Sequence, residues 1–211
     1  MTLRDTEKLV RAAVRAGVTD RAVLEAVRAV PRSAFVPCER AEEAYRDAPV
    51  PIPRGMVTTQ PSLVARMVEA LALTGAEHVL EVGTGYGYQT ALLACLSGDV
   101  ISVERLPDLA DRARANLDGQ GIANVEVVVG DGTEGVPSRA PYDAVLVSAA
   151  FPTVPEPLVG QLRTGGRLVQ PIGPGGVEDV TVFERTSAGL VRRGHVCPAS
   201  FVRLHGRHGY H

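Results

Sequence analysis

The sequence is poor in tryptophan, lysine and cysteine. Its 211 residues include no tryptophan and three cysteines, and Lys8 is the single lysine among 22 basic residues. Cys38, Cys95 and Cys197 are widely spaced and form no C-x-x-C pair. They supply no disulfide framework, so we expect a reducing, cytoplasmic location. No cluster of metal-ligating residues is evident in the sequence, and we expect no metal site.

Charge and hydropathy exclude two further classes of partner. The formal net charge is −2, and no block of arginine or lysine occurs, which disfavours nucleic acid as a partner. The first five residues, Met1 to Asp5, are polar and lack the apolar core of a signal peptide. No apolar run approaches the length of a membrane span, so we expect no membrane partner. We expect a monomer.

The pattern of predicted secondary structure changes at residue 77. Before that point, amphipathic helices are expected at 3–17 and 20–29, with Thr19 capping the second, and another helix is expected from Pro61 to about Leu73. The proline-rich stretch 31–57 is predicted to be irregular. It is nonetheless too apolar for a free linker, and we expect it to form a lid or a wrapped connection.

After residue 77 the pattern alternates between strand and helix, which favours a parallel, doubly wound α/β sheet. An antiparallel hairpin is expected near the end of the chain. The expected divisions are 1–60 (N-terminal helices and substrate-covering segment), 61–175 (ligand-binding α/β core) and 176–211 (C-terminal strands completing the sheet and cleft). Strands are predicted at 78–82, 100–103, 125–129, 144–148, 167–170, 180–184 and 190–196, and helices at 87–96, 107–119 and 155–163.

A glycine-rich turn follows the first of these strands. Gly83, Gly85 and Gly87 alternate with larger residues between an apolar run and an Ala/Leu-rich run. Such glycines permit a sharp strand-to-helix turn and a close approach of ligand to the main chain. The spacing is neither the G-x-G-x-x-G of dinucleotide-binding proteins nor a P-loop. The turn alone predicts a nucleotide-type site of unspecified ligand.

Acidic residues at the carboxyl ends of successive strands narrow the choice of ligand. Glu104 follows the second strand, where an acid about 20 residues after the loop can accept both ribose hydroxyls. Asp131, between Gly130 and Gly132, follows the third strand and can hydrogen-bond an adenine amino group. Glu81, before the turn, suits an ammonium group and disfavours a pyrophosphate. Together these residues favour S-adenosylmethionine over NAD.

Several segments resemble the protein-L-isoaspartate O-methyltransferase family along nearly the whole chain. The resemblance rests on residues 47–52, Gly55 to Pro61, Leu80 to Thr90, 130–132 and 141–145. It implies a Rossmann-like class I methyltransferase sheet in which the last two strands exchange places relative to most methyltransferases. It also implies methylation of the free carboxylate of L-isoaspartyl residues, followed by non-enzymatic collapse of the ester to a succinimide.

The resemblance also assigns roles to residues of this chain. Thr59 stands where the family has a serine that touches cofactor and substrate, Thr58 where it has an aliphatic residue, and Arg203 where proline is usual. Arg203 either meets a substrate carboxylate or is a surface residue. The expected catalytic residue is Thr59, with Thr58, Thr59, Val202 and Arg203 contacting substrate. The expected cofactor residues are Glu81, Gly83, Thr84, Gly85, Gln89, Glu104, Asp131 and Gly132.

Three alternatives stay open at this point. The chain could methylate an aspartate in a dedicated precursor peptide, forming an aspartimide or isoaspartate, and the departures at Thr58, Thr59 and Arg203 are the only support for this alternative. It could bind the cofactor without catalysing a reaction. The intact acidic and glycine positions argue only that cofactor binding has not been lost. It could be an NAD-dependent oxidoreductase, but Glu81 and the missing Tyr/Lys or His arrangement count against that function.

Overall fold

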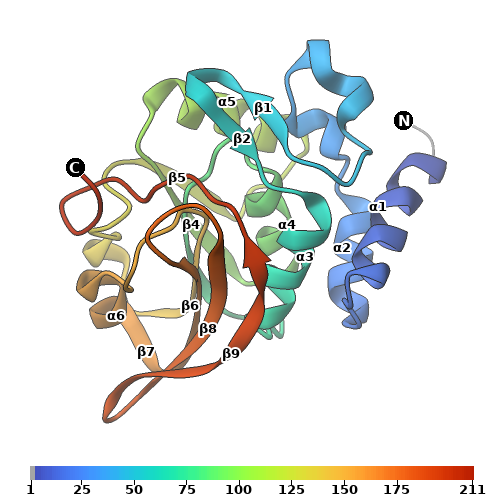
Figure 1. Ribbon diagram of the computed structural model, residues 1–211. Helices are drawn as coiled ribbons and strands as arrows, with labels where there is room; N and C mark the ends of the chain where they lie inside the picture. Colours follow the sequence, from blue (N-terminus) through green and yellow to red (C-terminus); the bar gives the residue numbers. More distant parts are fainter. Residues whose placement is uncertain (1–2) are drawn as a thin grey trace.

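A mixed seven-stranded sheet forms the centre of the molecule. The computed structural model describes residues 3–211, and its strands follow the order β5-β4-β3-β6-β7-β8-β9 across the sheet (Figure 1). Five neighbouring strands, β5, β4, β3, β6 and β7, run parallel to one another, and β8 is antiparallel to both of its neighbours. These strands span His78–Val82 (β3), Asp99–Glu104 (β4), Val125–Val129 (β5), Tyr142–Val147 (β6), Leu162–Ile172 (β7), Glu178–Thr186 (β8) and Gly189–Ala199 (β9). The predicted doubly wound α/β fold with a C-terminal hairpin is confirmed.

Successive side chains of the central strands point to opposite faces of the sheet, and each face contributes to a hydrophobic core. Val79 and Val100 face the core shared with helices α1 to α5, whereas Leu80 and Ile101 face a second core that contains Leu158 of α6. Both cores are needed because a parallel sheet is buried on its two faces. The helices span Leu3–Arg15 (α1), Arg21–Ala29 (α2), Pro61–Ala70 (α3), Tyr88–Leu96 (α4), Pro107–Gly119 (α5) and Glu156–Gln161 (α6).

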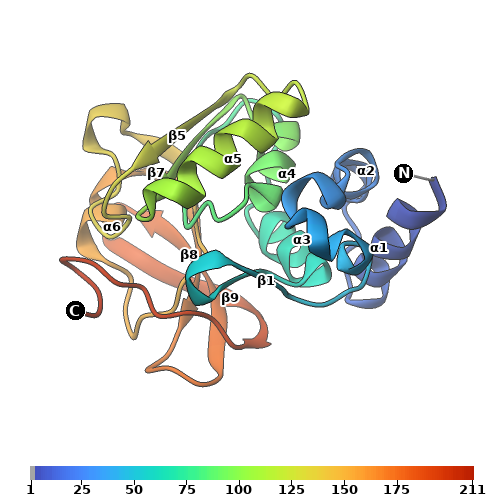
Figure 2. The same ribbon diagram turned by 90° about the horizontal axis from the view of Figure 1, so that it is seen from above.

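The N-terminal helices α1 and α2 lie at one flank of the molecule, beside α3 and α4 (Figure 2). The cap of α2 differs from the prediction: Asp20, not Thr19, accepts hydrogen bonds from the first amides of the helix. Glu69 of α3 explains the difference, since its carboxylate accepts from the Thr19 hydroxyl and from the amides of both residues. Among residues 3–211, no helix has the length and apolarity that a membrane crossing needs.

The stretch 31–57 is more regular than predicted. It contains 3₁₀ turns and an antiparallel pair of short strands, β1 (Val50–Ile52) and β2 (Met56–Thr58), joined through Pro53–Gly55. These strands of three residues are too short to show a clear alternation, and Pro51 interrupts the apolar pattern. The β1–β2 hairpin and the C-terminal residues 202–205 contribute to one cavity at the carboxyl edge of the sheet.

Candidate active site

The glycine turn between β3 and α4 forms the floor of the site. Gly83, Gly85 and Gly87 all have positive φ, at 97°, 56° and 93°. A side chain at Gly83 would also press on Ser148, whose Cβ lies 3.4 Å from the position that a Cβ would take. Non-glycine residues rarely adopt this left-handed conformation, so the turn depends on glycine for its shape.

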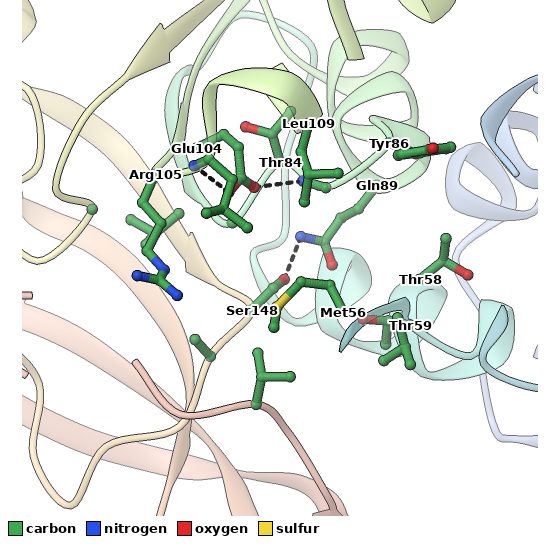
Figure 3. Close-up of a pocket in the computed structure, with 18 of the residues that line it drawn as sticks. Met56, Thr58, Thr59, Thr84, Tyr86, Gln89, Glu104, Arg105, Leu109 and Ser148 are labelled. Atoms are coloured by element: carbon green, nitrogen blue, oxygen red, sulfur yellow. Dashed lines mark hydrogen bonds between the residues drawn. The ribbon is translucent and has the colours of Figure 1, made fainter. Parts of the chain in front are cut away.

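A cavity of about 370 Å³ lies above this turn (Figure 3). The ends of β4 and β6, the β1–β2 hairpin and the C-terminal segment form its walls. Most of the residues predicted to bind ligand line it: Thr58, Thr59, Gly83, Thr84, Gly85, Gln89, Glu104, Gly132, Val202 and Arg203. The carboxyl edge of the sheet thus gathers residues from distant parts of the sequence, as in other open α/β sheets.

Glu104 presents its carboxylate at the cavity wall. One oxygen accepts from the Gly85 amide at 2.9 Å and the other from the Leu106 amide at 3.0 Å. These bonds fix the side chain at the end of β4, and each carboxylate oxygen can accept a further hydrogen bond. Glu104 is therefore held ready to receive the hydroxyl groups of a ligand.

Glu81 lies below the glycine turn rather than on the cavity surface. Its buried carboxyl accepts hydrogen bonds from Gln89 at 2.8 Å, from Ser102 at 2.6 Å and from Thr90. Burial raises the pKa of Glu81 to about 7, although these hydrogen bonds act in the opposite direction. Glu81 thus acts on the cavity through the Gln89 side chain.

Gln89 connects this buried acid to the cavity. Its amide nitrogen donates to Glu81 and, at 2.7 Å, to the hydroxyl of Ser148 (Figure 3). Its amide oxygen is buried and has no hydrogen-bond partner among the described residues. Because Gln89 lines the cavity, this unpartnered acceptor suits a ligand that brings a donor such as an ammonium group.

Asp131 lies behind the cavity wall. Its carboxylate accepts from the Thr133 amide and hydroxyl and, at 2.7 Å, from the Arg207 amide. Partial burial alone would raise the pKa of Asp131, but hydrogen bonds from Thr133 and Arg207 lower it overall. The side chain therefore holds the C-terminal loop, and the adjacent Gly132 is the residue that lines the cavity.

The predicted substrate residues occupy different environments. Thr58 and Thr59 both line the cavity, but the Thr58 hydroxyl accepts a hydrogen bond of 2.8 Å from the buried guanidinium of Arg32. Arg203 is exposed, and its guanidinium lies 4.9 Å from the ring centre of Tyr210. This contact holds the Arg203 guanidinium against Tyr210, and Arg203 also lines the first cavity.

A second cavity, of about 470 Å³, adjoins the first. It lies between the start of α3 and the end of β9, and its lining includes Arg66 and Phe201. Val57, Thr59, Ser148 and Val202 line both cavities. These four residues thus form a junction that borders both the cavity at the glycine turn and the opening toward α3.

The sequence predictions gave no role to Ser148, which lines both cavities, or to Arg32, which bonds the Thr58 hydroxyl. Ser148 directly follows β6, and this place at a strand end is a signal that could have identified it. Arg32 gave no such signal, because nothing in its local pattern indicates that the side chain is buried.

Comparisons with known proteins identify the family of this chain. Residues 4–209 match the family model described as protein-L-isoaspartate(D-aspartate) O-methyltransferase. A protein-L-isoaspartate O-methyltransferase of Methanoculleus marisnigri is 48% identical over 210 residues, covering 98% of this chain and 94% of the relative. Another, of Anaeromyxobacter dehalogenans, is 52% identical over 190 residues, covering 89% and 91%.

Solved structures give the same result. A protein-L-isoaspartate O-methyltransferase superposes with a TM-score of 0.85 at 30% identity, covering 97% of this chain and 67% of that chain. A Plasmodium falciparum structure in complex with S-adenosyl-L-homocysteine has a TM-score of 0.79 at 24% identity, covering 95% and 97%, and supports the fold. The chain belongs to the protein-L-isoaspartate(D-aspartate) O-methyltransferase family.

Proposed function

We propose that this chain transfers a methyl group from S-adenosylmethionine to the free carboxylate of L-isoaspartyl residues in proteins or peptides. Membership of the family supports the reaction. The observation that carries the proposal is the junction of the two cavities, where the glycine-turn cavity meets a second opening beside Thr59. Such a junction allows a cofactor and an acceptor carboxylate to meet from opposite directions.

The residues of the first cavity fit the cofactor chemically. When bound, S-adenosylmethionine supplies a methyl group on a positively charged sulfonium sulfur. Glu104 is the acceptor for ribose hydroxyls, and the main chain at Gly132 is the candidate for the adenine edge. The unpartnered oxygen of Gln89 suits the ammonium group. Gly83, Thr84 and Gly85 complete the cradle, and Glu81 supports it through Gln89.

The acceptor needs no general base. A carboxylic acid has a pKa near 4, so it is ionised at neutral pH and its oxygen is already a nucleophile. Transfer breaks the carbon–sulfur bond, forms a carbon–oxygen bond and moves no proton. The task of this chain is therefore to orient the carboxylate and exclude water. We propose that Thr59 orients it by donating a hydrogen bond, while Val57 and Val202 shield the junction.

Methylation of an isoaspartyl residue initiates its repair. In an isoaspartyl residue the free carboxylate is the α-carboxylate, because the backbone runs through the side chain. Its methyl ester loses methanol when the neighbouring amide nitrogen attacks the ester carbonyl, and a succinimide forms. Hydrolysis of the succinimide returns part of the material to normal aspartate. These later steps need no group of the enzyme.

The alternative of a dedicated precursor peptide loses two of its sequence arguments. The Thr58 hydroxyl is bonded to Arg32, and the Arg203 guanidinium is stacked on Tyr210. Both departures from the family pattern thus have a reason inside the fold, and neither requires an unusual acceptor.

The deciding experiment uses methyl-labelled S-adenosylmethionine with an isoaspartyl peptide and its aspartyl twin. We expect label in the isoaspartyl peptide alone, in a form that mild base releases as methanol. Equal labelling of both peptides, or of neither, would contradict the proposal. A labelled aspartyl twin alone would favour the precursor-peptide reaction.

A further inference from the structure

We propose that Ser148 is a second hydroxyl donor to the acceptor carboxylate and acts together with Thr59. The inference rests on the function proposed above and adds a catalytic residue to it. Ser148 begins the loop that follows β6, and its amide donates at 2.9 Å to the Val82 carbonyl of β3. The residue therefore has a fixed main-chain position at the carboxyl edge of the sheet.

The position of Ser148 between the two cavities is the first argument. Of the residues that line both cavities, Val57 and Val202 are apolar, and only Thr59 and Ser148 carry polar side chains. An ionised carboxylate at this junction has lost part of its hydration and needs donors from the protein. Two hydroxyls, one from each wall, are the side-chain donors that the junction offers.

The direction of the Ser148 hydrogen bond is the second argument. The Gln89 amide nitrogen has two hydrogens, and it directs them to the Glu81 carboxyl and to the Ser148 oxygen. While Glu81 is ionised, a flipped amide would place two oxygens against each other, so the carboxylate fixes the orientation of Gln89. The Ser148 oxygen is thereby an acceptor toward Gln89.

The Ser148 hydroxyl can therefore donate a hydrogen bond to a ligand in the cavity. Within residues 3–211, Gln89 is the hydrogen-bond partner recorded for the Ser148 side chain. A hydroxyl has one hydrogen to donate, and here it is not engaged by the protein. The partly buried serine consequently offers a donor at the junction, and a hydrogen bond from Gln89 holds its oxygen in place (Figure 3).

The second cavity indicates which ligand accepts the hydrogen bond from Ser148. The residues that we assign to the cofactor, Gly83 to Gly85, Glu104 and Gly132, line the first cavity, and none of them lines the second. Ser148 lines both. This place favours the acceptor carboxylate over the carboxylate of the cofactor.

The test compares Ser148→Ala and Ser148→Thr with the wild-type enzyme. Loss of a hydrogen bond to a charged group predicts a fall in kcat/KM for the isoaspartyl peptide of roughly ten- to a hundredfold in Ser148→Ala. The affinity for S-adenosylhomocysteine, measured by calorimetry, should stay within about twofold, and Ser148→Thr should recover most of the activity. Ser97→Ala is the matched control, because Ser97 donates to Leu93 at the end of α4, away from both cavities.

Wild-type methylation of the isoaspartyl peptide tests the proposed function separately from this inference. With that activity present, wild-type kcat/KM in Ser148→Ala would overturn the role of Ser148. So would a loss of S-adenosylhomocysteine affinity equal to the loss of kcat/KM, or a Ser148→Thr enzyme no more active than Ser148→Ala. A double-mutant cycle with Gln89→Met supplies an independent measure: if Gln89 orients the serine, removing Ser148 costs less activity in the Gln89→Met background.

Discussion

Arg32 donates a hydrogen bond of 2.8 Å to the hydroxyl of Thr58, and this contact fastens the segment that carries Thr59. Arg32 is fully buried. Its guanidinium also donates to the carbonyls of Ala44, Arg46, Ala48 and Thr59. Burial lowers the pKa of Arg32 to about 10, so the group remains charged at neutral pH. One buried cation thus collects the carbonyl groups of an otherwise irregular stretch.

Replacing Arg32 by methionine should destabilise the protein and misplace Thr59. The carbonyls of residues 44, 46, 48 and 59 lose a charged donor, and we expect a loss of at least about 3 kcal/mol in the free energy of unfolding. Chemical denaturation measures it. Arg21→Met is the control, because the Arg21 side chain is 92% exposed and its removal should cost less than about 0.5 kcal/mol. Equal stability of the two variants would show that Arg32 does not hold this segment.

Glu81→Gln should change the pH dependence of stability. The pKa of Glu81 is raised by burial to about 7 in the folded protein, from 4.5 in the unfolded chain. An acid whose pKa is raised by folding contributes stability that is fully present below its pKa in the unfolded chain. This stability is lost as the pH rises through its pKa in the folded protein. The loss is at most about 3 kcal/mol for this shift.

Unfolding measured at several pH values between about 5 and 8 checks this expectation. The wild-type protein should lose stability across that interval relative to Glu81→Gln. Glu25→Gln is the control, since the Glu25 side chain is 57% exposed on α2 and should leave the pH dependence as in the wild type. A constant difference between wild type and Glu81→Gln at every pH would mean that Glu81 is already ionised throughout.

Local patterns predicted several of the residues that line the first cavity. An apolar run, alternating glycines and an acid at the next strand end identify Gly83, Gly85 and Glu104 without knowledge of the fold, since each lies at the end of a predicted strand. The contacts of Arg32 could not be predicted in this way. Its acceptors lie 12 to 27 residues further along the chain, in a stretch without periodicity.

The contacts of the C-terminal loop could not be predicted from local patterns either. Arg207 donates to Asp131 across 76 positions of sequence, and no local pattern at Gly130 to Gly132 indicates that contact. The junction beside Ser148 likewise forms because Val202 accepts from the Ala150 amide at 2.8 Å. Tertiary pairing of the terminal segment therefore places Val202 in the lining of both cavities.

Glu104→Ala should weaken cofactor binding strongly. The carboxylate is the one acidic side chain on the wall of the cofactor cavity within residues 3–211, and hydrogen bonds to a charged acceptor contribute about 1.5–3 kcal/mol each. We expect the dissociation constant for S-adenosylhomocysteine to rise by roughly thirtyfold or more. Calorimetry measures it, and wild-type affinity in Glu104→Ala would refute the assignment. Glu126→Ala, on the exposed surface of β5, serves as the control.

Asp131→Ala should act mainly on the C-terminal loop. Both carboxylate oxygens are bonded within the protein, to Thr133 and to the Arg207 amide. We expect faster amide hydrogen exchange in residues 205–210 and a smaller loss of S-adenosylhomocysteine affinity than in Glu104→Ala. Unchanged exchange in this loop, together with an affinity loss as large as that of Glu104→Ala, would instead indicate direct contact between Asp131 and the cofactor.

Thr59→Val tests the hydroxyl that is proposed to orient the acceptor. Valine keeps the shape of the side chain and removes its donor, so packing against the junction should change little. We expect kcat/KM for an isoaspartyl peptide to fall by roughly ten- to a hundredfold, the cost of one hydrogen bond to a charged group, while S-adenosylhomocysteine still binds. Thr59→Ser retains the hydroxyl and should keep most of the activity. Because the acceptor is ionised without enzymatic help, the loss in Thr59→Val should be the same at every pH at which the protein is folded. A defect in Thr59→Val that disappeared on raising the pH would indicate a role in proton transfer and would contradict orientation as the function of Thr59.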